Sequence, residues 1–305
     1  MRYSLLIGFL LAFAVQLSAQ EVVQVVTKII EKTFNYQDGY EVNVEGQKAE
    51  IFVETWDKRE IGLRLEISAK HPDKATAETD LETVNFVAER IRNKVYLRNY
   101  RFGGGEQTES ILTVVYYITL PEDCPVYVKN YFGAANISNL TNRLRIFGEY
   151  SQIDIDNVKG LLDIRTRFGD IIGEKIDGNV TINARRSDVT LYEIAGNYQI
   201  NAQYGILKLA PTAGLLGLDI SAEKSEVFLY GDNADLFGYT LTATHGKVDA
   251  PDNLRLLALE DTPEVQKVQK VQIKPRRGET HPMITVSVTF GDVHLEKVPP
   301  EGLQY

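Results

Sequence analysis

The sequence has a single cysteine, Cys124, among 305 residues. An intramolecular disulfide is therefore excluded, and the chain must be stabilised by packing even in an oxidising compartment. Cys124 lies in the turn-like segment LPEDCP, away from histidines that would lower the pKa of a thiol. We interpret it as a small apolar filler rather than as a reactive nucleophile.

Positive charge and metal-ligand patterns are also scarce. The net charge is −9 and the pI is about 5.1, so nucleic acid is not an expected partner. The four histidines lack HExxH spacing, and one cysteine cannot build a zinc knuckle. The GGGE segment at 103–106 lacks the Lys-Ser/Thr pair of a phosphate-binding loop. The sequence therefore predicts no catalytic residue, no metal and no cofactor.

After residue 20, no stretch approaches the 18 apolar residues that a membrane span requires. The first residues combine Arg2, an apolar run over Leu5–Val15 and a small-residue cleavage site at Leu17-Ser18-Ala19. This combination is typical of a signal peptide. We predict a signal peptide at 1–19, no transmembrane segment, and export to the periplasm or the surface of a Gram-negative bacterium.

What the sequence does contain is a repeat with a period of 18 residues. A small residue recurs after steps of 18, 18, 18, 18, 20, 21 and 45 residues, at Gly133, Ser151, Gly169, Ser187, Gly205, Ser225, Gly246 and Gly291. Apolar residues alternate with polar ones on both sides, which predicts strands with one buried face. The small residue predicts a corner between two strands, where only a small side chain fits or where φ is positive.

Strand, corner, strand and turn at a fixed period are typical of a β-solenoid. We predict an all-β fold, a right-handed single-stranded β-helix with 18-residue coils. The alternative is a β-sandwich with coincidental spacing, but the strands of a sandwich vary in length and do not share corner residues.

The predicted organisation follows from where the period holds. Residues 20–120 form an N-terminal β region with irregular first coils and a cap, and 121–296 form the solenoid, with an excursion at 252–282 and a tail at 297–305. We expect an early coil centred on Gly46, a short helix within 72–90, and a final coil at 284–296 that closes the rod. The N-terminal region and the excursion are the candidate caps, because open ends expose strand edges.

Several motifs resemble a known family. The segments Val44-Glu45-Gly46 and Trp56-Asp57-Lys58, the YITLP segment, and the FG-D-I and YG-I-L runs resemble the secreted bacterial "putative adhesin" family of unknown function. Its members are similar to right-handed β-helices of the autotransporter-head kind. The resemblance covers residues 40–296. It implies the fold and brings no catalytic residues with it.

A second column lies directly before the corner residues. It reads Phe132, Tyr150, Phe168, Arg186, Tyr204, Lys224, His245 and Phe290. Because Arg and Lys do not easily occupy an interior, we expect this column to face outward, with Phe168, Arg186 and Tyr204 within cation–π reach. It is either a stabilising ladder or a strip that stacks on sugar rings or docks a partner. The candidate binding strip comprises Phe168, Arg186, Tyr204, Lys224 and His245.

Acidic residues follow the corner, including Asp170 and Asp188 near several arginines. They are either a calcium or lyase site of the kind found in β-helix polysaccharide lyases, or a solvated corner. Three functions therefore stay open. The first, which we favour, is a non-enzymatic adhesin or cell-envelope scaffold that recognises a glycan or an envelope protein. The others are a polysaccharide lyase and a purely structural envelope protein.

Overall fold

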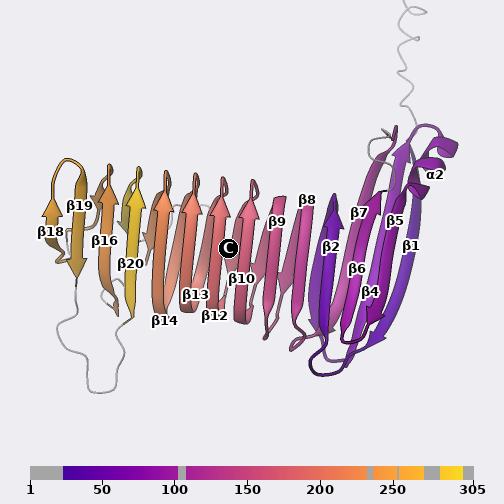
Figure 1. Ribbon diagram of the computed structural model, residues 1–305, viewed down its shortest axis with the longest axis horizontal. Helices are drawn as coiled ribbons and strands as arrows, with labels where there is room; N and C mark the ends of the chain where they lie inside the picture. The colour runs from indigo at the N-terminus through magenta and orange to yellow at the C-terminus, as the bar shows by residue number, and fades with distance from the viewer. Residues whose placement is uncertain (1–22, 102–107, 232–235, 253, 271–281, 298–305) are drawn as a thin grey trace, which may run out of the picture.

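The computed structural model describes residues 23–101, 108–231, 236–252, 254–270 and 282–297. These residues form an all-β structure with one helix, drawn out into a long row of strands (Figure 1). The predicted signal peptide at 1–19, the GGGE segment and His281 lie outside the described residues. Among the residues described, no helix is long and apolar enough to cross a membrane.

The N-terminal part of the row combines strands with the helix. Its elements are β1 (Gln24–Asn35), β2 (Glu41–Gln47), β3 (Ala49–Trp56), β4 (Glu60–His71), α2 (Lys74–Glu82), β5 (Val84–Ile91), β6 (Lys94–Arg101) and β7 (Ile111–Pro121). Within the predicted helical stretch 72–90, α2 ends at Glu82 and β5 follows at once. Asp73 caps α2 by accepting a hydrogen bond from the Thr76 amide at 2.9 Å.

The remaining strands carry the repeat. They are β8 (Val126–Ser138), β9 (Leu144–Asp156), β10 (Lys159–Arg167), β11 (Ile171–Glu174), β12 (Asp177–Arg185), β13 (Val189–Gln203), β14 (Ile206–Glu223), β15 (Glu226–Tyr230), β16 (Gly238–Thr244), β17 (Val248–Asp249), β18 (Leu257–Asp261), β19 (Val265–Lys270), β20 (Met283–Thr289) and β21 (Val293–Glu296).

Successive repeats lie over one another in parallel, one repeat length apart. Leu162 of β10 is the register partner of Val180 of β12, and Ile171 of β11 is the partner of Val189 of β13. Each repeat thus contributes to two parallel columns of strands, one before the corner and one after it. The predicted register between repeats is confirmed.

The predicted alternation of buried and exposed side chains is also confirmed. On β10, Leu162 and Ile164 are buried, whereas Leu161 and Arg165 point outward. Each fully buried aliphatic side chain contributes about 1.5–3 kcal/mol of hydrophobic stabilisation. The inward rows therefore form one continuous apolar core along the stack.

The corner departs from prediction in one respect. The positive φ belongs to the residue before each small residue, for example Phe168 with φ 56°, and not to Gly169 itself. Gly169 is required by close approach, because a Cβ there would collide with the carbonyl of Ser151 on the neighbouring repeat. The serine hydroxyl of one repeat accepts a hydrogen bond from the corner glycine of the repeat before it, as the Gly169 amide donates to Ser187 Oγ at 3.2 Å.

The order of repeats at both ends differs from their order in the sequence. β20 pairs in parallel with β14 on one side and β16 on the other, so residues 283–296 lie second from the end of the parallel stack (Figure 1). The prediction that they close the rod is wrong. At the other end, β2 lies between β6 and β8 in the same way. Residues distant in sequence are thus inserted between neighbours at each end.

The early coil predicted around Gly46 is present, but its corner lies three residues further along the chain. Gly46 is the partner of Asn130, which lies three residues before the corner, and Ala49 takes the place equivalent to Gly133. Asn130 is fully buried and donates to the carbonyl of Ala49 at 3.0 Å. This hydrogen bond ties the N-terminal coil to the regular repeats.

Antiparallel strands cover both ends of the parallel stack. β4 pairs with β7 and β5 with β6 at the N-terminal end, and β19 pairs with β16 at the other. β18 completes a hairpin with β19 inside the predicted excursion. These pairings take up the backbone groups that an open parallel edge would leave free.

We expect Gly169→Ala to lower the free energy of unfolding by about 1–3 kcal/mol, because its Cβ would press on the Ser151 backbone. Urea denaturation followed by circular dichroism measures the change. The control is Gly217→Ala, where the nearest atom to the new Cβ, Asn197 Oδ1, lies 3.4 Å away. Equal stability of the two variants would contradict this account of the corner.

Candidate functional site

A column of side chains with left-handed backbone conformation runs along the corner of the stack, and we call it the corner ladder. Its φ values are 52° at Lys48, 59° at Phe132, 52° at Tyr150, 56° at Phe168, 52° at Arg186, 59° at Tyr204, 51° at Lys224, 60° at Phe290 and 56° at His245. All of these side chains are exposed and point outward from the apolar core, as predicted for every member except Lys48, which the predicted column did not include.

The rings and cations of the corner ladder contact one another along the stack. Tyr150 stacks on Phe132 with ring centroids 4.9 Å apart and on Phe168 at 4.7 Å. Arg186 lies between the rings of Phe168 and Tyr204, at 5.3 and 5.8 Å from their centroids. The cation–π contact predicted for these three residues is confirmed.

Lys224 continues the corner ladder beyond Tyr204. Its ammonium lies 5.1 Å from the Tyr204 ring centroid and donates to the Tyr204 hydroxyl at 3.2 Å, and this hydrogen bond raises the pKa of the lysine. The next member of the ladder is Phe290, which directly follows β20, the strand inserted between β14 and β16. His245 stacks on Phe290 with ring centroids 4.9 Å apart. Lys224 and His245 are therefore separated by Phe290, which the sequence order did not place between them.

The large side chains of the corner ladder offset the strain of their own backbone conformation by stacking on one another. A left-handed conformation costs about 1–2 kcal/mol per residue other than glycine. An aromatic pair contributes about 0.5–1.5 kcal/mol beyond its area burial. The cost of the backbone conformation and the gain from one ring contact are thus of similar size, and Tyr150 and Arg186 each make two such contacts. The rings and the guanidinium keep part of their surface exposed to solvent.

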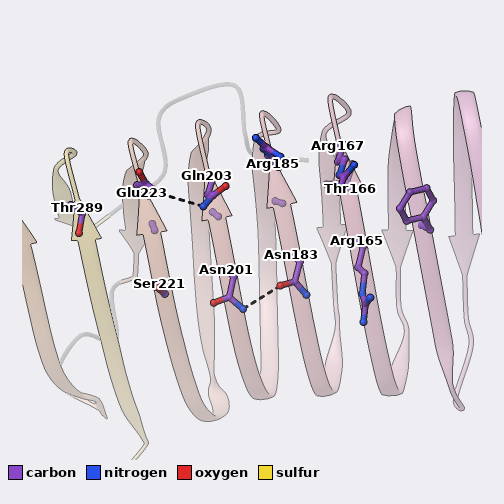
Figure 2. A pocket seen from close by; sticks show the side chains of 14 residues that line it. Arg165, Thr166, Arg167, Asn183, Arg185, Asn201, Gln203, Ser221, Glu223 and Thr289 are labelled. Carbon is purple, nitrogen blue, oxygen red and sulfur yellow. Dashed lines mark hydrogen bonds between the residues drawn. The ribbon is translucent and has the colours of Figure 1, made fainter.

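A groove of about 690 Å³ lies on the outer face of the first strand column, next to the corner ladder. Figure 2 shows arginines at one end, and amides and hydroxyls further along. It is lined by Phe147, Arg165, Thr166, Arg167, Asn183, Ala184, Arg185, Asn201, Ala202, Gln203, Ser221, Ala222, Glu223 and Thr289. Several of these residues directly precede a ladder residue in the chain, as Arg185 precedes Arg186. The groove and the corner ladder therefore form one surface.

The carboxylates of the acidic residues after the corner accept hydrogen bonds from backbone amides. Asp170 Oδ1 accepts from the amide of Asp188 at 2.9 Å, and Asp188 Oδ1 accepts from the amide of Ile206 at 2.8 Å. Asp292 accepts from the amide of Lys247 at 2.8 Å in the same way. Each carboxylate thus joins its repeat to the next one along the stack.

Cys124 is fully buried and has no disulfide partner. Burial, with a smaller contribution from Asp123, raises the pKa of its thiol to about 12. The thiol therefore stays protonated at neutral pH and packs as an apolar group.

Sequence reasoning missed two features of this surface. The groove depends on side chains from six strands, β9, β10, β12, β13, β14 and β20, which no single segment of the sequence reveals. A second left-handed column at Asn139, Asn157, Lys175 and Glu193 also recurs every 18 residues. Here a signal was present in the spacing, and Asn157 Nδ2 donates to Asn139 Oδ1 at 2.7 Å across one repeat.

Several solved structures of bacterial proteins are similar to this chain. One is described as a putative adhesin from Parabacteroides distasonis, 12% identical, covering 89% of this chain and 97% of that one, with a TM-score of 0.47. A second, from Parabacteroides merdae, is 12% identical, covers 88% and 96%, and has a TM-score of 0.43. A putative cell adhesion protein from Clostridium sporogenes is 13% identical, covers 90% and 100%, and has a TM-score of 0.32.

No family model matches the sequence. No curated protein matches it either. At the identities and TM-scores of the solved structures, the likeness does not assign a family, a ligand or a function to this chain.

Substitution of Tyr150 tests the balance between strain and stacking. We expect Tyr150→Ala to be less stable than Tyr150→Gly by about 1 kcal/mol, because both lose the ring contacts and only glycine relieves the positive φ. The measurement is urea denaturation. Tyr96, which is 37% exposed on β6 and does not have a positive φ, serves as the control. Tyr96→Ala should be more stable than Tyr96→Gly. If Tyr150→Ala were likewise more stable than Tyr150→Gly, the argument from backbone strain would be wrong.

Thiol titration tests the environment of Cys124. At pH 8 a colorimetric thiol reagent should not react with the folded protein, and it should react with one thiol after denaturation in urea. Because the pKa rises from 9.0 to about 12 on folding, the unfolded chain loses this proton first. The stability contributed by the thiol is complete below pH 9 and falls as the pH rises toward 12. Rapid labelling of the folded protein would show that the thiol is accessible.

Proposed function

We propose that the stacked repeats form a right-handed single-stranded β-helix. Successive strands of one column are parallel and are joined through a strand of the other column, as β10 is joined to β12 through β11. Such parallel crossovers are right-handed in nearly all proteins. The antiparallel strands at both ends act as caps.

On this rigid rod, the corner ladder is a binding strip for a glycan or an envelope protein. The observation that carries the proposal is the row of exposed rings and cations over Phe168, Arg186, Tyr204 and Lys224, held at strand spacing by backbone hydrogen bonds. Flat ring faces and guanidinium planes stack on sugar rings and on aromatic side chains. The protein acts as an exported adhesin or scaffold of the cell envelope and is not an enzyme.

A polysaccharide lyase is the alternative that the corner carboxylates first suggested. In a lyase of that kind, carboxylates hold calcium beside a basic side chain. Here Asp170 and Asp188 accept hydrogen bonds from backbone amides of the next repeat, which gives them a structural role. This engagement favours binding over catalysis.

A glycan array probed with the purified mature protein tests the proposed function. We expect the double variant Arg186→Ala plus Tyr204→Ala to weaken binding to any glycan retained by the wild type, by about tenfold, because it removes a cation–π pair and a stacking face. Arg98→Ala plus Tyr100→Ala is the matched control, since Arg98 lies 5.1 Å from the Tyr100 ring centroid on β6. If Arg186→Ala plus Tyr204→Ala bound the glycan as tightly as the wild type, the proposed binding role of the corner ladder would be wrong.

A further inference from the structure

Two arginines lie side by side at one end of the groove without a neutralising partner. Arg167 of β10 and Arg185 of β12 are direct register partners, and both are exposed. Neighbouring strands lie about 4.8 Å apart, so two like charges face each other at a distance that is unfavourable. Across the described residues, neither guanidinium forms an ion pair within 4 Å, although Glu149 is the register partner of Arg167 on its other side.

The rest of the groove is arranged differently. Asn201 donates to Asn183 at 3.3 Å, and Gln203 donates to Glu223 at 3.3 Å (Figure 2). Arg165 is paired with Asp163 at 3.3 Å. These polar side chains are thus paired, either across repeats or within a strand, whereas Arg167 and Arg185 repel each other in a chain whose net charge is −9.

We propose that the groove binds a uronic-acid glycan, with one sugar carboxylate held between Arg167 and Arg185 and the adjoining ring resting on the corner ladder. This assignment rests on the proposed glycan-binding role of the ladder. Guanidinium groups bind carboxylates through paired charge-assisted hydrogen bonds, and a carboxylate between two of them removes their repulsion.

The groove suits a sugar chain better than a peptide. Asn183, Asn201, Ser221 and Thr289 offer both donors and acceptors to sugar hydroxyls along its length. An extended peptide would need a free strand edge, but β12, β13 and β14 are hydrogen-bonded on both sides. Glu223 lies at the far end of the groove from Arg167, so the site for a carboxylate is at the arginine end.

Calorimetric titration with galacturonate, mannuronate and hyaluronate oligomers tests the proposal. At least one should bind the wild type, and its carboxyl-methylated form should bind about tenfold more weakly or worse, because charge-assisted hydrogen bonds are lost. Arg167→Gln plus Arg185→Gln should weaken binding of the acidic form by about tenfold and leave the methylated form unchanged. Rising salt should weaken only the acidic form.

The charge-matched control is Arg143→Gln plus Lys159→Gln, which removes two exposed cations outside the groove. If the groove variant binds the acidic oligomer like the wild type, or like this control, the proposal fails. It also fails if none of the oligomers binds the wild type, or if polyglutamate binds more tightly than they do. Circular dichroism confirms that each variant is folded.

Failure of the ladder and failure of the groove give different results. If Arg186→Ala plus Tyr204→Ala retains full binding while the groove variant loses it, the arginine site stands and the strip role of the ladder falls. If the ladder variant loses binding of neutral and acidic glycans alike, and the groove variant loses neither, the strip role of the ladder stands and the arginine site falls.

Discussion

The structure depends on the superposition of parallel strands, repeat on repeat, at one strand spacing. This constraint requires every repeat to turn its corner at the same place, and it explains the Gly and Ser residues there. Gly205 has no room for a Cβ beside the Ser187 carbonyl, and its amide donates to Ser225 Oγ at 3.3 Å. The alternation of glycine and serine thus follows from backbone contact between neighbouring repeats. Glycine leaves space for the carbonyl of the adjacent repeat, and serine supplies a hydroxyl that accepts a hydrogen bond from the glycine amide.

The same contact generates the exposed surface. Turning the corner forces one residue per repeat into the left-handed region, and its side chain then points away from the core. Because repeats are superposed, these side chains come within stacking distance, as Tyr150 and Phe168 do at 4.7 Å. The corner ladder and the groove beside it are therefore rigid features. A ligand bound there would meet rings, guanidiniums and amides that need no reordering.

Much of this could be predicted from the sequence, because a repeat is a local pattern. The apolar alternation, the corner and the outward column of Phe168, Arg186 and Tyr204 all follow from spacing alone. The centre of the early coil was placed at Gly46 rather than Ala49, because both are small and only the register distinguishes them. The groove could not be predicted, since its walls come from outward rows of several repeats and its depth depends on the size of each side chain.

The sequence by itself determined the content of each repeat: which residues face inward, where the corner lies and which side chains stand on it. Only the tertiary structure decided which repeat lies next to which. Parallel strands recognise one another through backbone hydrogen bonds that carry no record of sequence order, so any repeat of matching length can be inserted. For that reason β20 lies between β14 and β16, and Phe290, not His245, is the neighbour of Lys224.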